Sequence, residues 1–134
     1  MIILDSSFLV AVEVKEDQNH EKAIIIRDKI IKGDFGDIII SDYIFDETVT
    51  VTLNKTKDLN KAIEVGEILM DLTDLLKIEE EIIERSWELF KKQKETKFSF
   101  TDCTILALMQ ENGITNIATF DKDFKKVKEI NVIE

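Results

Sequence analysis

The sequence contains no proline, four glycines, one histidine and one cysteine among its 134 residues. A single cysteine, Cys103, cannot form an intramolecular disulfide, so the cysteine content gives no indication of secretion. With His20 as the one histidine, the chain lacks the ligands of an ordinary zinc site and the partners of a histidine-based nucleophile. The apolar run Met1–Leu4 is interrupted at once by Asp5, and no long apolar segment follows. Neither a signal peptide nor a membrane span is expected, and we predict a cytoplasmic protein.

The charge of the chain is strongly acidic, with 28 Asp and Glu against 18 Lys and Arg and a net charge of −10. Such acidity argues against a nucleic-acid binder, which normally has a basic surface. The imbalance is uneven, however, because residues 91–134 hold 8 basic and 7 acidic side chains. Two lysine clusters lie in that part of the chain: Lys91, Lys92, Lys94 and Lys97, then Lys122, Lys125, Lys126 and Lys128. They are either solvated helix faces, the ordinary case, or basic patches beside an acidic pocket.

Short β-branched runs alternate with longer helical patterns along the chain. The patterns predict strands at Met1–Leu4, Asp37–Ile40, Asn116–Thr119 and Asn131–Ile133, helices from Ser6 or Ser7 onward and over Asn19–Lys32, Asp42–Asn54, Leu59–Leu72, Glu79–Lys94 and Phe100–Asn112, and a strand or a helix end at Leu75–Ile78. Apolar strands joined by helices indicate an α/β domain, here residues 1–134, whose parallel sheet is covered on both faces.

Functional residues of such sheets gather at the carboxyl ends of the strands, which selects Asp5 and Asp121. Asp5 follows the first strand and is either a metal ligand or the N-cap of the next helix, unless Ser6 or Ser7 takes the cap. Asp121 lies in a polar segment that is also an ordinary turn, which the Thr119 hydroxyl could hold by a hydrogen bond to the backbone.

Glu47 shares a helix face with Ile44 and Val51, so its carboxylate should point inward. A buried carboxylate without a partner is costly or has a shifted pKa. A metal ion would remove that cost, as would a lysine partner or a position at the edge of the core.

Asp102 has a structural and a functional interpretation that do not exclude each other. Ser99 and Asp102 have the spacing of a capping box at the start of a helix. Asp102 also lies at the top of the buried stripe formed by Ile105, Leu106 and Met109. Together with the other carboxylates it would supply hard oxygen ligands, which suit Mg²⁺ or Mn²⁺.

Four segments, in this order, resemble those of the PIN-domain nucleases, and within them the small single-domain kind that includes the VapC toxins. The segments are Met1–Ser7, Phe45–Glu47, Phe100–Cys103 and Thr119–Phe124, of which the last is the most specific. The resemblance covers essentially the whole chain. It implies a three-layer α/β/α fold with a mainly parallel sheet of four or five strands.

The resemblance also implies an endoribonuclease that uses one or two Mg²⁺ or Mn²⁺ ions. Its catalytic and metal-binding residues would be Asp5, Glu47, Asp102 and Asp121, with Ser6, Thr119 and Asp123 orienting ligands or substrate. The partners would be an RNA substrate, a small antitoxin if the protein is a toxin, and a second copy of the chain. The overall acidity, with only Arg27 and Arg85 as arginines, departs from what tight RNA binding requires.

Two other functions are compatible with parts of the pattern. The first is a catalytically silent PIN-like module that binds RNA or protein, against which the four occupied acidic positions count. The second is a phosphotransferase of the haloacid dehalogenase kind, which requires another aspartate two residues after Asp5. Ser7 occupies that position.

Overall fold

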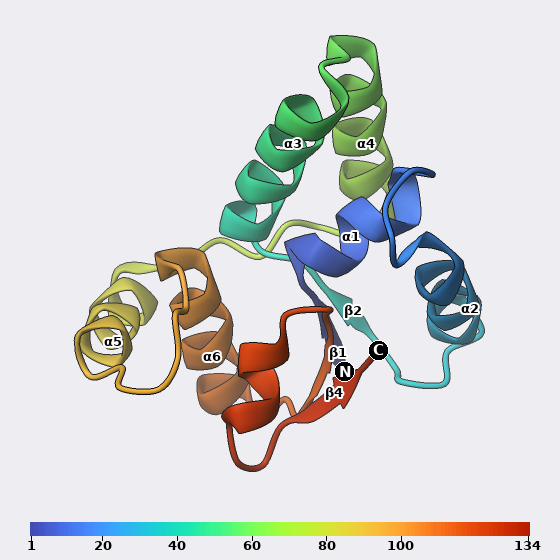
Figure 1. Ribbon diagram of the computed structural model, residues 1–134. Helices are drawn as coiled ribbons and strands as arrows, with labels where there is room; N and C mark the ends of the chain where they lie inside the picture. The colour runs from blue at the N-terminus through green and yellow to red at the C-terminus, as the bar shows by residue number, and fades with distance from the viewer.

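A four-stranded parallel sheet forms the centre of the computed structural model, which describes residues 1–134. The strands are β1 (Ile2–Leu4), β2 (Ile38–Ile39), β3 (Asn116–Ala118) and β4 (Asn131–Ile133), in the spatial order β2-β1-β3-β4. Helices cover both faces of this sheet (Figure 1). The α/β class and the parallel sheet are therefore as the sequence predicted.

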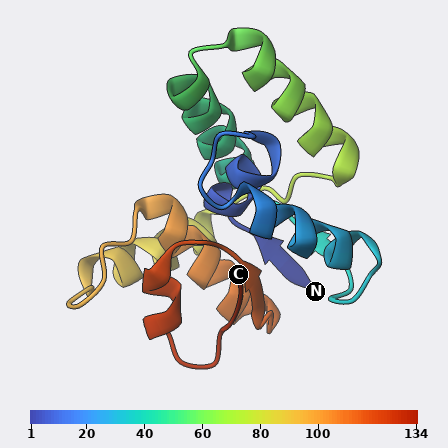
Figure 2. The same cartoon turned by 45° about the vertical axis from the view of Figure 1, so that its right-hand side comes forward.

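The helices are α1 (Ser6–Glu13), α2 (His20–Ile31), α3 (Asp42–Thr56), α4 (Leu59–Leu72), α5 (Glu80–Lys91), α6 (Phe100–Asn112) and a 3₁₀ helix, η1 (Lys122–Lys126). Figure 1 shows α1 and α2 on one side of the sheet and α5 and α6 on the other. The α3–α4 hairpin projects away from the sheet, as the turned view in Figure 2 also shows. No helix has the length and apolar character needed to cross a membrane.

Strand β1 lies inside the sheet and determines its register. Ile3 pairs with Ile39 of β2 on one side and with Ile117 of β3 on the other. All three residues of β1 are buried, which explains why the strand is apolar without alternation. Its carboxyl end therefore places the next residue, Asp5, beside the end of β3, where the Asp5 amide donates to the Ala118 carbonyl.

The helix boundaries follow local signals in the sequence. Ser99 caps α6 as part of a complete capping box, and Gly113 ends the helix with a φ of 62°. Helix α5 ends at Lys91, short of the predicted Lys94. The segment Leu75–Ile78 is neither a full strand nor a helix end, because it forms one parallel bridge, between Leu76 and Ser41.

We predict that Ile3→Ala destabilises the protein by about 2–5 kcal/mol, because it leaves a cavity at a fully buried position of the inner strand. Urea denaturation followed by circular dichroism measures the change. Ile25→Ala is the matched control, since Ile25 is 61% exposed, and it should change stability by less than about 0.5 kcal/mol. Equal effects of the two substitutions would contradict the assigned core.

Candidate metal centre

Asp5 is buried at the carboxyl end of β1 and serves as N-cap of α1. Its Oδ1 accepts the Ser6 backbone N–H at 2.7 Å. Its Oδ2 accepts hydrogen bonds from the hydroxyls of Ser7 at 2.6 Å and Thr119 at 2.7 Å. The two roles predicted as alternatives, cap and site residue, are thus combined in one side chain, whose orientation is fixed from three directions.

Glu47 approaches the same point from the inner face of α3 and is half-buried. Its Oε1 accepts a hydrogen bond from the Ser6 hydroxyl. Neither a lysine nor an arginine forms a salt bridge with it, so the partner considered as an alternative to a metal is not present. Ser6 therefore connects the start of α1 to α3.

Asp102 contributes the third carboxylate from the first turn of α6. The Ser99 amide donates to its Oδ2 at 2.8 Å, and its own amide donates to the Ser99 hydroxyl at 3.1 Å. This capping box fixes the backbone of the turn and leaves the carboxylate facing the other two acids.

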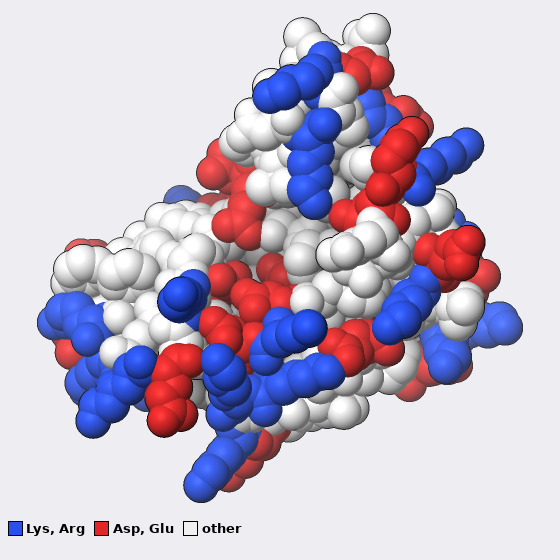
Figure 3. All heavy atoms as spheres, viewed as in Figure 1, with Lys and Arg blue, Asp and Glu red and all other residues white.

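The side chains of Asp5, Glu47 and Asp102 each place a carboxylate oxygen within 4.8 Å of the others. None of the three forms a salt bridge with a basic side chain. Figure 3 shows acidic atoms gathered in a hollow between the α3–α4 hairpin and the body below it, with lysines around the rim. Segments far apart in the sequence thus build one concentrated negative site.

The pKa values of all three carboxyls are raised. Burial is the largest cause for each of them. For Asp102, burial and the nearby charge of Asp5 raise the pKa to about 7. For Glu47, the charge of Asp5 adds to the effect of burial. Hydrogen bonds from the surrounding hydroxyls lower the pKa of Asp5 and Glu47, but they do not cancel the effect of burial. A cation in the cluster would favour the charged form of every member.

The hydroxyls of Thr119 and Ser7 lie together at the Oδ2 atom of Asp5. Their oxygens lie 3.1 Å apart, and both contact Asp5. Ser7 also accepts from the Phe120 amide, and Thr119 accepts from the Asp121 amide at 3.0 Å, as the sequence predicted for this turn. For the site, the sequence indicates only a capping role for Ser7. The signal was present, since a hydroxyl two residues after a strand-end aspartate can reach its carboxylate.

Asp121 is not a member of the three-carboxylate group. It caps η1, and its Oδ1 accepts the Asp123 amide at 2.9 Å. It lies near enough to Asp5 for its charge to help raise the pKa of Asp5. The structure therefore places Asp121 at the border of the site.

Asp123 binds Lys97 and Lys126 and is not a member of the three-carboxylate group. It accepts the Lys97 amide and the Lys126 ammonium, both at 2.7 Å, and these partners lower its pKa. These hydrogen bonds connect η1 to the segment before α6. The role of Asp123 in the structure is therefore to hold η1 in place, and not to orient a ligand or substrate at Asp5.

Residues 2–130 match the PIN domain family, and the chain belongs to that family. The relatives it resembles are of the small VapC kind. Ribonuclease VapC6 of Methanocaldococcus jannaschii is 26% identical over an alignment that covers 99% of this chain and 96% of the relative.

The fold is also found in solved structures. VapC20 of Mycobacterium tuberculosis, a sarcin-ricin loop cleaving toxin, superposes with a TM-score of 0.81 at 26% identity, covering 94% of each chain. VapBC2 of Rickettsia felis, solved with a DNA fragment from its promoter, gives a TM-score of 0.70 at 16% identity, covering 98% of this chain and 97% of that one. The second likeness concerns the fold alone.

In the metal-free protein we predict that stability falls as pH rises from about 4 to about 7. A carboxyl whose pKa is raised in the folded state binds its proton more tightly in the folded protein than in the unfolded chain. As the pH rises above the pKa of the unfolded chain, ionisation therefore favours the unfolded state and the free energy of unfolding falls. Asp102→Asn should reduce this slope and make the protein more stable than the wild type above pH 7, by at most about 4 kcal/mol. Urea denaturation in EDTA across this pH range measures the effect. Parallel pH profiles of the wild type and the variant would refute it.

Proposed function

We propose that this PIN-domain protein is a divalent-metal-dependent endoribonuclease with Asp5, Glu47 and Asp102 as its metal-binding catalytic residues. The observation that carries the proposal is the convergence of these three carboxylates without any basic partner. Asp121 borders this group and can act through a water molecule or on a second ion. The nuclease relatives support the same class of reaction.

The donor set fits Mg²⁺ or Mn²⁺. Both ions prefer hard oxygen ligands, and Mg²⁺ usually binds one or two carboxylates and keeps several waters. The cluster consists of carboxylates, with neither imidazole nor thiolate among them. The three carboxyls have raised pKa values and no basic partner, so their charged forms are disfavoured. A divalent ion would stabilise the charged forms, because each carboxylate would be attracted to the ion.

The residues of the chain supply positioning and charge. Ser7 and Thr119 hold the Asp5 carboxylate, Ser6 holds Glu47, and the Ser99 capping box holds Asp102. An ion bound there would lower the pKa of a water molecule and offset charge on the scissile phosphate. Because these hydrogen bonds already orient the carboxylates, little rearrangement would be needed to bind such an ion. The site is in this sense preorganised.

RNA as the substrate rests on the relatives, one of which is a ribonuclease and the other a toxin that cleaves the sarcin-ricin loop. We further propose that the protein is the toxin of a toxin–antitoxin pair, because VapC and VapBC proteins share its fold. Its protein partners would then be a small antitoxin and a second copy of the chain.

We predict that the wild type cleaves single-stranded RNA with Mg²⁺ or Mn²⁺ and loses activity in EDTA. Asp102→Asn should lower the cleavage rate at least about 100-fold. Mutation of a residue that only hydrogen-bonds to a metal ligand already costs about 10–100-fold in activity, and a ligand itself should cost more. Gel analysis of labelled RNA measures the rate, and thermal denaturation confirms that the variant folds. An unchanged rate in the variant would assign the activity to a contaminant. A wild type that binds RNA without cleaving it with either ion would favour the catalytically silent module.

The positions of Glu47 and Asp121 predict different effects on metal affinity. Glu47→Gln removes a charge inside the three-carboxylate group and should weaken Mn²⁺ binding at least about 10-fold. Asp121→Asn removes a charge at the border and should weaken it less. Isothermal titration with Mn²⁺ compares the two variants, which differ from the wild type by one charge each. A larger loss in Asp121→Asn would show that the metal lies nearer to η1.

A further inference from the structure

The two lysine clusters, which are separate in the sequence, meet in the structure at Asp123 of η1. Lys97 belongs to the first cluster and Lys126 to the second. The Lys97 amide and the Lys126 ammonium group donate to the Asp123 carboxylate, each at 2.7 Å. Lys126 also donates to the Glu95 carbonyl at 2.9 Å. Asp123 and Lys126 therefore connect η1 to the segment that leads into α6.

A buried aromatic contact joins the same two segments. Phe98 and Phe124 pack with ring centroids 4.9 Å apart, and both side chains are buried. Phe98 follows Lys97, and Phe124 follows Asp123. The lysines of this region therefore extend from backbone that is fixed on the core, and not from a loop without tertiary contacts.

The cations of this region outnumber its acid. Lys97 and Lys122 are exposed and form no salt bridge, whereas Lys126 pairs with Asp123. The hydrogen bond from Lys126 is the largest cause that lowers the pKa of Asp123, and the charge of Lys97 also lowers it. The ammonium group of Lys97 is therefore close enough to act on the same carboxylate. We name Lys97, Lys122 and Lys126 the basic rim.

The basic rim borders the metal centre. Lys122 directly follows Asp121, whose charge acts on Asp5. Lys97 lies just before the capping box that holds Asp102. Figure 3 shows lysine side chains along the edge of the acidic hollow. In a chain of net charge −10, positive charge is thus concentrated beside the most acidic site.

We infer that the basic rim binds the phosphates of single-stranded RNA next to the phosphodiester that lies at the metal centre. An RNA strand with one phosphate at the carboxylates carries further phosphates on either side, and the carboxylates repel all of them. Ammonium groups at the edge of the site would offset this repulsion. Such contacts position a strand without reading its sequence. The inference rests on the proposed ribonuclease function and specifies how its substrate is held.

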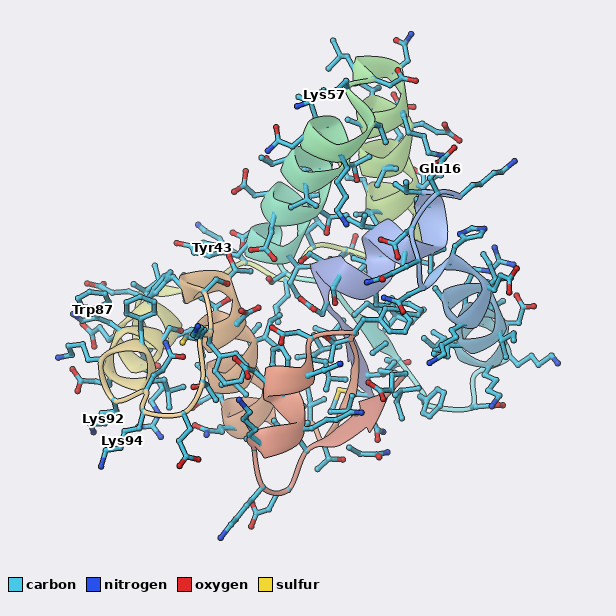
Figure 4. The ribbon with its side chains drawn as sticks, viewed as in Figure 1. Glu16, Tyr43, Lys57, Trp87, Lys92 and Lys94 are labelled. Atoms are coloured by element: carbon cyan, nitrogen blue, oxygen red, sulfur yellow. The ribbon has the colours of Figure 1, made fainter.

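Lys92 provides a matched control for the basic rim. Lys92 and Lys94 are exposed and unpaired, as Lys97 is. Figure 4 shows both of them at the end of α5, away from η1. Lys92→Met removes the same charge as Lys97→Met and leaves the basic rim intact. A difference between the two variants therefore reports the location of the charge, and not the net charge of the protein.

Fluorescence anisotropy in EDTA measures the affinity for a short labelled single-stranded RNA without cleavage. Lys97→Met and Lys122→Met should each reduce the slope of log Kd against log salt by about 0.7, the value for one phosphate contact on a single strand, and weaken binding roughly 5- to 10-fold at about 50 mM salt. Lys92→Met should change neither quantity. Equal effects in all three variants, or no effect in any of them, would overturn the proposal. So would a wild type that does not bind the RNA.

Cleavage kinetics with Mg²⁺ separate this inference from the proposed function. Lys97→Met and Lys122→Met should raise KM and leave kcat within about 2-fold, because contacts to neighbouring phosphates act alike in the ground state and the transition state. Cleavage with an unchanged KM in both variants would overturn the basic rim and leave the ribonuclease function standing. Binding in EDTA that depends on the basic rim, without cleavage in Mg²⁺ or Mn²⁺, would support the rim and refute the ribonuclease function.

Discussion

Repulsion between three clustered carboxylates, two of them buried and one half-buried, is the constraint on which the site depends. Asp5, Glu47 and Asp102 would separate if their side chains were free. No basic side chain pairs with any of them, so other groups must hold them in place. The protein does so with neutral donors, namely the hydroxyls of Ser6 and Ser7 on the first turn of α1 and that of Thr119 after β3. Hydrogen bonds donated by these hydroxyls stabilise the charged forms of Asp5 and Glu47 without cancelling the negative potential that a divalent ion would meet.

The parallel sheet supplies the geometry that brings these groups together. The carboxyl ends of β1 and β3 are adjacent because the two strands pair directly. The residue after each strand, Asp5 and Thr119, therefore meets the other without a long loop. Helices α3 and α6 then need only to begin near that edge for Glu47 and Asp102 to face the strand-end aspartate, and both helices begin at a serine cap.

Much of this arrangement could be predicted from the sequence, because its signals are local. Apolar runs predicted the strands. The capping-box spacing of Ser99 and Asp102 predicted the start of α6, and the position of Asp102 on the buried stripe of that helix predicted its place in the site. The placement of Asp121 could not be predicted, since it depends on whether its side chain turns toward Asp5 or caps η1, a choice made by the backbone of one turn. The solvent exposure of Trp87 and Phe90 on α5 could not be predicted from the sequence either. Helical periodicity shows which residues share a face, but it does not show whether another element covers that face.

The three acids of the proposed metal centre come from the beginning, the middle and the last third of the chain. During synthesis, the segment that carries Asp102 emerges well after β1 and α3 have been made, and Thr119, which holds Asp5, emerges later still. A nascent or truncated chain therefore has the first two carboxylates but not the complete centre. A protein that cleaves RNA from such a site would remain inert toward the ribosome and messenger that produce it until its last strands have joined the sheet.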